Sequence, residues 1–267
     1  MLITSAQNSL IKQVRALHQR KERQKSGLFL VEGILPIGAA LEAGWEITHL
    51  LYDPQRLESE FGRQILQQVE ARGGLVRAVA SYVLESVSEK ENPQGLLAIV
   101  RQRSRTLADL LPQTLHFGAA LVTPQDAGNV GTVLRTLDAV GGDVLFLLEG
   151  GVDPYHPGVV RASMGALFWV PWVQASFAEF LSWARRHGLF LLGTSAHARQ
   201  DYRQLRPRHP WVLVLGNEQK GLSAEQRAAC DTEVALPMRG RASSLNLAIA
   251  AGILLYHYAF GTETLTP

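Results

Sequence analysis

The feature that most constrains the fold is a series of short apolar segments in the second half of the chain, each followed by a helical pattern. Segments such as FGAALVT, DVLFLLE, LFLLGTS and WVLVLG are apolar without interruption through their centres. Strands of this kind have to be buried on both faces, as they are in parallel sheets covered by helices. From residue 115 onward the sequence therefore predicts an α/β fold built on a parallel sheet.

The first hundred residues carry a separate α/β pattern, in which helical segments alternate with shorter strands. The helical segment 5–23 has a basic face. A charged stretch broken by proline, RQRSRTLADLLPQT, separates the two patterns and is typical of a linker. We therefore expect a small α/β domain over residues 1–100, a linker over 101–114 and a parallel-sheet domain over 115–267.

Polar residues mark the starts of three predicted helices. Ser176 and Ser223 are each followed three residues later by Glu or Gln, which is the spacing of a capping box. The apolar segment 247–256 follows a polar stretch, and we expect Ser243 or Ser244 to cap the helix that it forms.

Composition excludes several classes of protein. The single cysteine, Cys230, excludes an internal disulfide and is typical of a reducing compartment. The eight histidines do not follow metal-ligand spacing, so we expect no metal. The N-terminus lacks a signal-peptide pattern, and the longest apolar segment is about half of the ~20 residues that a membrane helix needs. We therefore expect a cytoplasmic protein without a membrane partner.

Positive charge gathers in a few segments of a chain whose net charge is only +2. Residues 1–27 contain six Lys or Arg against one acid, residues 185–208 contain six arginines against one acid, and RQRSR follows residue 100. Such patches favour a polyanionic partner. The alternative is that they are solvated helix faces and a linker.

Three loops that follow predicted strands are rich in glycine and polar residues: 123–136, 213–223 and 236–246. Because ligands bind beyond the carboxyl ends of the strands in a parallel sheet, these loops form the candidate site. In the first loop, Asn129 lies at the start of a predicted helix and Arg135 lies deeper in it. The alternatives are that Asn129 is a plain helix cap and that Arg135 is a surface or semi-buried arginine.

The other two loops place further polar groups at strand ends. Gly216 ends a strand and Glu218 follows it, which presents a carboxylate between glycines; the alternative is an ordinary turn with a surface glutamate. Ser243, Ser244 and Asn246 precede the final apolar helix. Capping explains one hydroxyl. The second serine, Asn246 and the flexible Gly240 between two arginines are left unexplained by capping.

Familiar nucleotide-binding motifs are absent from the sequence. Neither a Gly-x-Gly-x-x-Gly dinucleotide fingerprint nor a Walker phosphate loop occurs. A nicotinamide-dependent dehydrogenase and a nucleoside triphosphatase therefore have no support from motifs.

Taken in order, the three loops resemble a known family. NVGTVLRT, LVLGNEQKGLS and LPMRGRASSLNLAIAAGILLYHY are similar to the three motifs of the SPOUT-class RNA 2'-O-ribose methyltransferases, the TrmH/SpoU family, and RASMGALFWVP between them is similar too. This likeness covers about 115–260. ITSAQNSLIKQVRAL and GLFLVEG resemble the ribosomal-protein-L30e-like substrate-binding domain that many members carry.

The resemblance implies a fold, a cofactor and a reaction. The second domain would be a SPOUT methyltransferase whose C-terminal segment forms a trefoil knot. It would bind S-adenosyl-L-methionine, form a homodimer and methylate a ribose 2'-hydroxyl in rRNA or tRNA. The separate N-terminal domain favours a large structured RNA, hence 23S rRNA. The alternatives are a tRNA 2'-O-methyltransferase and a non-catalytic RNA-binding protein on the same fold.

The resemblance also implies roles for individual residues. A guanidinium stays protonated at neutral pH and is a poor general base, so we expect Arg135 to clamp a phosphate or a hydroxyl; the alternative is base action, which would need a strongly altered site. Ser244 and Asn246 would fix the sugar or the cofactor by hydrogen bonds. The residues at motif positions tied to catalysis or substrate are Asn129, Arg135, Glu218, Ser244 and Asn246. Those expected to hold the cofactor are Thr194, Gly216, Asn217, Leu236, Met238, Ser244 and Leu245.

Three positions depart from the family pattern. Gln219 stands where the family usually has glycine, Ala127 where proline is frequent and Leu137 where alanine is frequent. None of these changes removes a group with an expected role in catalysis, so we expect an active enzyme.

The basic N-terminal helix would supply contacts to RNA. We expect Arg20, Lys21 and Arg23 to contact phosphates, and such contacts set affinity but not sequence choice.

Overall fold

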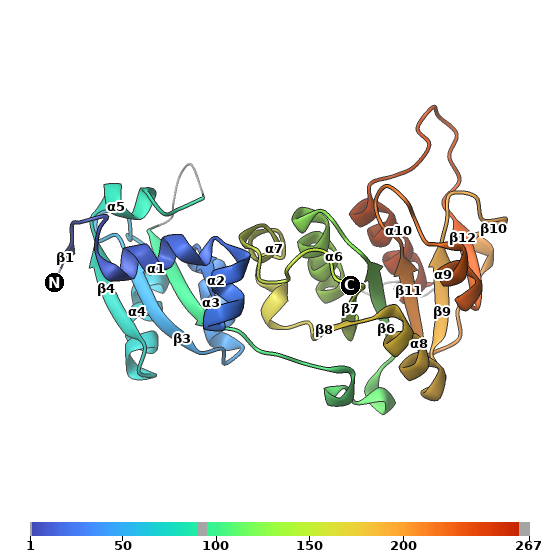
Figure 1. Cartoon of the computed structure of the whole chain (residues 1–267), viewed down its shortest axis with the longest axis horizontal. Coiled ribbons are helices and arrows are strands. Elements are labelled where there is room, and N and C mark those ends of the chain that lie inside the picture. Colours follow the sequence, from blue (N-terminus) through green and yellow to red (C-terminus); the bar gives the residue numbers. More distant parts are fainter. Residues whose placement is uncertain (1, 90–94, 262–267) are drawn as a thin grey trace. The chain divides into compact units, whose positions relative to one another are not determined.

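The structure is a computed structural model that describes residues 2–89 and 95–261 (Figure 1). The chain forms two compact units, which are described separately. The N-terminal unit comprises Met1–Arg103 and Asp153–Trp169, and the C-terminal unit comprises Ser104–Val152 and Val170–Pro267. The segment 153–169, which the sequence analysis assigned to the second domain, therefore packs with the first.

The N-terminal unit is built on a mixed five-stranded sheet. Its strand order is β1 (Leu2–Ile3), β4 (Leu75–Val79), β3 (Ile47–Tyr52), β5 (Leu96–Arg101) and β2 (Leu28–Glu32). β5 runs antiparallel to both of its neighbours, and the other pairs are parallel. The helices of this unit are α1 (Ser9–Leu17), α2 (Arg20–Ser26), α3 (Ile34–Glu42), α4 (Glu60–Ala71), α5 (Ser81–Glu85) and α7 (Pro157–Ala162). The predicted small α/β unit is thus present.

The basic segment expected to form one helix over 5–23 is two helices, α1 and α2. The chain breaks at His18 and Gln19, and the break leaves backbone carbonyl groups without helical partners. Arg23 supplies a donor for these carbonyl groups, because its Nη1 donates to the carbonyl oxygens of Leu17 at 2.9 Å and His18 at 2.8 Å. A side chain from the second helix therefore stabilises the end of the first.

The structure contradicts the expectation that Arg23 contacts RNA phosphates. Its side chain is only 1% exposed, and its Nε donates to Oδ2 of Asp153 at 2.8 Å. A guanidinium that is buried and engaged in this way cannot reach a phosphate, so the expectation for Arg23 was wrong. Arg20 and Lys21 are exposed, as an RNA contact requires.

The segment 153–169 contributes to the core of the N-terminal unit. Tyr155 lies 4.4 Å from Phe29 between ring centroids, and the ring of Phe168 lies 5.3 Å from that of Trp45. The Trp45 Nε1 donates to the carbonyl oxygen of Phe168 at 3.1 Å. These aromatic contacts explain why a segment between two strands of the other unit belongs here.

The C-terminal unit is built on a seven-stranded sheet whose pairs are all parallel. Every residue of its strands β7 and β11 is buried, which means that both faces of the sheet are covered. The prediction of a parallel-sheet α/β domain is confirmed. The strand order is β10 (Gln200–Asp201), β12 (Thr232–Ala235), β9 (Phe190–Thr194), β11 (Trp211–Leu215), β6 (Phe117–Val122), β7 (Val144–Leu148) and β8 (Trp172–Ala175).

Four helices pack on this sheet: α6 (Ala127–Val140), α8 (Phe177–Arg186), α9 (Ala224–Ala229) and α10 (Leu247–Phe260). The capping boxes predicted at Ser176 and Ser223 are both present. The predicted cap of the last helix is wrong. Asn246 caps α10, with its Oδ1 accepting from the N–H groups of Ala248 and Ile249 at 2.9 and 3.2 Å. No helix in residues 2–89 and 95–261 is long and apolar enough to cross a membrane.

Two histidines have pKa values lowered by their surroundings. Burial is the larger cause for both His49 on β3 and His257 on α10, and the neighbouring guanidinium groups of Arg77 and Arg206 add to it. Arg206 Nη1 lies 3.1 Å from Nε2 of His257. Because arginine can only donate, this ring nitrogen accepts and the ring is neutral.

These lowered pKa values make stability depend on pH. The unfolded chain binds protons at these histidines near their usual pKa of 6.5, and the folded chain binds them only at lower pH. The stability that the neutral histidines contribute is therefore fully present above pH 6.5 and is lost as the pH is lowered through that value. We predict that the midpoint of thermal unfolding falls between about pH 7.5 and 5.5, and that His257→Gln reduces the fall because it removes one group that takes up a proton on unfolding. Identical pH profiles for wild type and variant in calorimetry would contradict the assignment.

Candidate functional site

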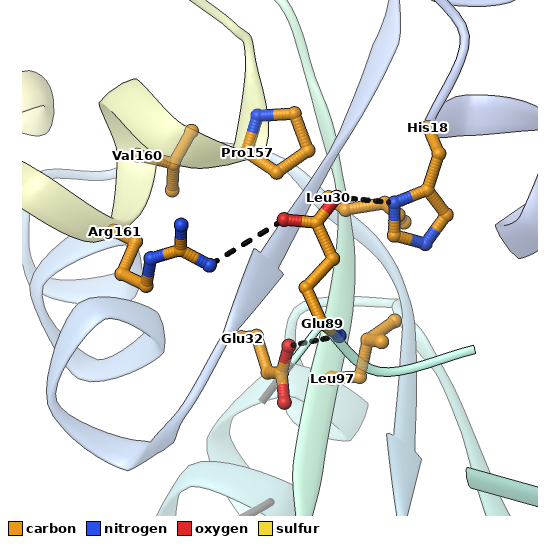
Figure 2. A pocket seen from close by; sticks show the side chains of 8 residues that line it. All are labelled: His18, Leu30, Glu32, Glu89, Leu97, Pro157, Val160 and Arg161. Carbon is orange, nitrogen blue, oxygen red and sulfur yellow. Dashed lines mark hydrogen bonds and ion pairs between the residues drawn. The ribbon is translucent and has the colours of Figure 1, made fainter. Parts of the chain in front are cut away.

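The N-terminal unit contains a small cavity beside α7 (Figure 2). Its volume is about 30 Å³, too small for a nucleotide. His18 Nδ1 and Arg161 Nη1 lie 3.0 and 3.4 Å from the carboxylate oxygens of Glu89, and His18 Nε2 lies 2.9 Å from the carbonyl oxygen of Val87. These groups compensate one another's charge, so we regard the cluster as structural.

The C-terminal unit contains a much larger cavity, of about 760 Å³. It lies where the loops after β9, β11 and β12 meet the first turns of α6 and α10. This is the carboxyl edge of a parallel sheet, at which ligands bind in such folds. The wall combines apolar side chains such as Leu215, Val234 and Leu254 with a limited set of polar groups, which is typical of a small-molecule site.

The structure brings together all but one of the residues predicted from the sequence. Arg135 does not line the cavity; its side chain is exposed on α6, which agrees with the alternative of a surface arginine and not with a semi-buried one. The predicted residues that do line the cavity are Asn129, Thr194, Gly216, Asn217, Glu218, Leu236, Met238, Ser244, Leu245 and Asn246.

The loop after β11 is shaped by Gly216 and Asn217. A Cβ atom on Gly216 would lie 2.2 Å from the carbonyl carbon of Gly221 and from the nitrogen of Leu222, so the backbone closes tightly here. Asn217 Oδ1 accepts from the N–H of Gln219 at 3.0 Å. Its Nδ2 donates to the carbonyl oxygen of Thr123 at 2.9 Å, which ties this loop to the one after β6.

The backbone conformation at Gln219 explains why this position does not need the glycine that is usual in the family. Its backbone does not adopt the left-handed conformation that favours glycine, whereas Gly221 does, with φ +67°. A side chain at Gln219 therefore costs no backbone strain. It lines the cavity and adds an amide to the wall.

Glu218 accepts hydrogen bonds from the loop after β6. Its Oε1 lies 3.2 Å from the N–H nitrogen of Gln125 and 3.1 Å from that of Asp126. The same oxygen accepts from Nδ2 of Asn129 at 3.2 Å. Glu218 is partly buried and holds three donors, so the alternative of an idle surface glutamate is wrong.

Asn129 and Asn246 continue this arrangement to the third loop. Asn129 is 7% exposed, and its Oδ1 accepts from Nδ2 of Asn246 at 2.9 Å. Asn246 Oδ1 then caps α10. We call Glu218, Asn129 and Asn246 the three-loop network. Asp126 is the cap of α6, with its Oδ1 accepting from the N–H of Asn129 at 2.8 Å, so the alternative of a plain cap for Asn129 is wrong.

Further polar groups belong to the cavity wall. Ser243 and Ser244 are exposed and belong to its wall. Thr194 Oγ1 donates to the carbonyl oxygen of Val214 at 3.1 Å. Sequence reasoning missed the neighbouring residues 195–197, which also line the cavity. Their signal was their place directly after a strand. Within residues 2–89 and 95–261, no group of His, Cys, Asp and Glu is arranged to hold a metal.

Comparison with known families identifies the family of the part of the chain that contains this cavity. A family model described as the SpoU rRNA Methylase family matches residues 117–256. This range contains all three loops and the three-loop network. The chain belongs to the SpoU rRNA methylase family. A second family model, described as the MRM3-like substrate binding domain, matches residues 8–98 in the N-terminal part. The resemblance drawn from the sequence is confirmed.

Relatives match the SpoU chain over nearly its whole length. It is 36% identical to a 23S rRNA (uridine(2479)-2'-O)-methyltransferase of Streptomyces viridochromogenes, over 94% of this chain and 90% of that protein. It is 30% identical to the 23S rRNA (guanosine(2553)-2'-O)-methyltransferase RlmP of Bacillus subtilis, over 96% and 98%. Among solved structures, an AdoMet-bound rRNA methyltransferase from Sinorhizobium meliloti matches with a TM-score of 0.90 and 37% identity, covering 99% of this chain and 98% of that one.

We predict that Gly216→Ala weakens binding of the predicted cofactor by this SpoU protein. The added Cβ would force Gly221 and Leu222 away, and the cavity wall would move with them. Affinity for S-adenosyl-L-methionine should fall by at least about tenfold, which corresponds to ~1.4 kcal/mol, in titration calorimetry. Gly240→Ala is the control, because its Cβ would meet nothing within 4 Å. Equal affinities of the two variants would contradict the role of the closed loop.

Proposed function

We propose that this protein transfers the methyl group of S-adenosyl-L-methionine to a ribose 2'-hydroxyl of 23S rRNA. One observation carries the proposal: the three motif loops converge on one 760 Å³ cavity and are joined there by the three-loop network. Two full-length relatives are named 23S rRNA 2'-O-methyltransferases. A tRNA methyltransferase and a non-catalytic RNA-binding protein remain as outcomes of the test below.

The residues present fit the cofactor. The cavity is large enough for an adenosine with a methionine chain, and its wall offers apolar surface next to backbone groups at strand ends. Backbone groups around Gly216, Leu236 and Leu245 would hold the cofactor, and Thr194 and Met238 would line its pocket. The bound cofactor supplies a methyl group on a sulfonium, which is already a good leaving group. The predicted cofactor is confirmed by the AdoMet-bound structural relative.

The protein's own contribution would be to position the ribose hydroxyl. Orientation alone supplies a large part of the rate in reactions of this kind. Ser244, exposed in the cavity wall, would donate to or accept from the sugar. Arg135 would hold a phosphate or the hydroxyl from the exposed side of α6.

We also propose a homodimer through α10. One side of this helix exposes Ile249, Ile253 and Tyr256, with exposed fractions of 56, 39 and 50%. They are spaced by four and three residues and so form one apolar stripe. α10 packs against α6, the helix that carries Arg135. A second copy on this stripe would cover the apolar surface and bring its own groups toward the site.

Three finer expectations are proposals as well. We propose that the C-terminal segment forms the trefoil knot, since β12 lies beyond β9 in the sheet whereas α10 packs back against α6 and β11. We propose functional domains over 1–100 and 115–267 with a linker over 101–114. The family models, at 8–98 and 117–256, support this division. An rRNA substrate supports a cytoplasmic location.

The test of function is methyl transfer from labelled S-adenosyl-L-methionine into rRNA and tRNA from cells that lack the gene. We predict label at a ribose 2'-oxygen of 23S rRNA. Arg135→Ala should reduce kcat by about a hundredfold or more, the size of effect that misplacing a reacting group can have, while cofactor affinity is retained because Arg135 does not line the cavity.

Other outcomes of this assay separate the alternatives. Label in tRNA alone would identify a tRNA methyltransferase. Absence of label from naked RNA and from ribosomal subunits alike, in a sample without cofactor affinity, would identify a non-catalytic RNA-binding protein. An Arg135→Ala enzyme as fast as wild type would remove Arg135 from the proposed site.

The N-terminal unit would bind the RNA through α1 and α2. Lys12, Lys21 and Lys25 are exposed, and none takes part in the ion pairs of the described residues. Exposed cations of this kind are free to release counterions from phosphates. Arg23 is excluded from this surface because it is buried.

We predict that replacing Lys12, Lys21 and Lys25 by glutamine weakens binding to 23S rRNA fragments. The slope of log affinity against log salt should fall by about two to three, roughly one for each phosphate that the variant no longer neutralises. Arg63→Gln on α4 is the control, since it removes one exposed cation from a different helix of the unit. A salt slope that stays at the wild-type value in filter binding would exclude this surface.

A further inference from the structure

The segment Gly151–Asp153, which we call the junction segment, is the point at which the chain passes from the C-terminal to the N-terminal unit. On its first side it is seated on the loop after β6. A Cβ atom on Gly151, where φ is +92°, would lie 2.3 Å from the carbonyl oxygen of Pro124 and 3.0 Å from its nitrogen. The N–H of Val152 donates to the same oxygen at 2.9 Å.

The loop that contacts the junction segment is the one whose N–H groups donate to Glu218. Pro124 directly precedes Gln125 and Asp126, whose N–H groups donate to the Glu218 carboxylate. Thr123 before it has φ +49°, an unfavourable conformation for a branched side chain that surrounding contacts have to maintain. The position of Pro124 therefore sets the geometry of one side of the three-loop network.

The other side of the junction segment is anchored in the N-terminal unit. The carboxylate of Asp153 is 11% exposed and binds the guanidinium of Arg23, with Oδ2 lying 2.7 Å from Nη2. Arg23 belongs to α2 and also holds the end of α1. The residue next to Val152 is thus fixed to the two helices that we assign to RNA binding.

We propose that the junction segment positions the loop 123–126 for methyl transfer, and that Gly151 and Asp153 are positioning residues of the enzyme. The proposal rests on the proposed function. The N–H groups of Gln125 and Asp126 that donate to Glu218 keep their positions only while contacts hold the junction segment at both ends. Neither residue touches the substrate or the cofactor cavity; both act through Pro124.

Two adjacent glycines provide a matched test. Gly150 also has a positive φ, +75°, but a Cβ atom there would meet nothing within 4 Å. Alanine therefore strains the backbone at both positions and displaces Pro124 only from Gly151. We expect Gly151→Ala to lower kcat for rRNA by tenfold or more with KM for RNA within about twofold of wild type. Gly150→Ala should keep kcat within about twofold.

Asp153→Asn tests the second anchor, because it keeps the shape of the side chain and removes its charge. We expect it to lower kcat in the same direction, with assays run well below the measured unfolding midpoint. The double variant with Gly151→Ala should be little slower than the slower single variant, since both changes act through one segment.

The proposal is overturned if Gly151→Ala and Gly150→Ala have the same kcat, or if the effects of Gly151→Ala and Asp153→Asn multiply as independent sites do. Should Gly151→Ala fail to fold, Asp153→Asn decides alone, and an unchanged kcat refutes the anchor. A wild-type protein that transfers no methyl group to any RNA would instead overturn the proposed function. The two failures are therefore distinct.

Discussion

The hydrogen bonds among Glu218, Asn129 and Asn246 are the interaction on which the candidate site depends. The three residues lie up to 117 positions apart in the chain, and each belongs to a different loop. A parallel sheet brings them together because all its carboxyl ends lie at one edge. The network then fixes the loops to one another, and the cavity is the space that this arrangement leaves open. Without these bonds the sheet would still position the loops and the bond from Asn217 to Thr123 would still join two of them, but the third loop would lose its bond to Asn129.

The same network explains why an apolar helix begins with polar residues. Asn246 uses its oxygen to cap the start of α10 and its nitrogen to bind Asn129, so one side chain caps the helix and joins two loops. Asn129 is almost fully buried, and a buried amide that loses its partner costs about 1–3 kcal/mol. Replacing any one member would therefore leave another unsatisfied. Ser243 and Ser244 remain free for a ligand because Asn246, and not a serine, provides the cap.

Much of this architecture could be predicted from sequence because it rests on local patterns. Uninterrupted apolar segments identified the strands β6, β7, β9 and β11, and the resemblance to a family's motifs named eleven site residues, of which ten line one cavity. What could not be predicted depends on pairs distant in sequence. Arg23 contacts the carbonyl groups at the break between α1 and α2 and also binds Asp153. Segment 153–169 packs in the N-terminal unit through Tyr155 and Phe168. Arg135 is exposed because of the side of α6 that it occupies, which spacing alone did not decide.

The geometry also limits which group could take the proton of a ribose hydroxyl. Glu218 is the only carboxylate of the three-loop network, and its Oε1 already accepts from two N–H groups and an amide. Protonating it would weaken the bonds that hold the loops, so proton transfer to Glu218 would loosen the site at the moment of reaction. Arg135 carries its charge throughout neutral pH and has no lone pair to offer. Of the other groups in the cavity wall, the Asp126 carboxylate accepts from the N–H of Asn129 as the cap of α6, and the His197 imidazole and the Ser244 hydroxyl remain. Because hydrogen bonds hold the loops of the site to one another, rigid loops would orient the ribose hydroxyl, and orientation supplies a large part of the rate in reactions of this kind.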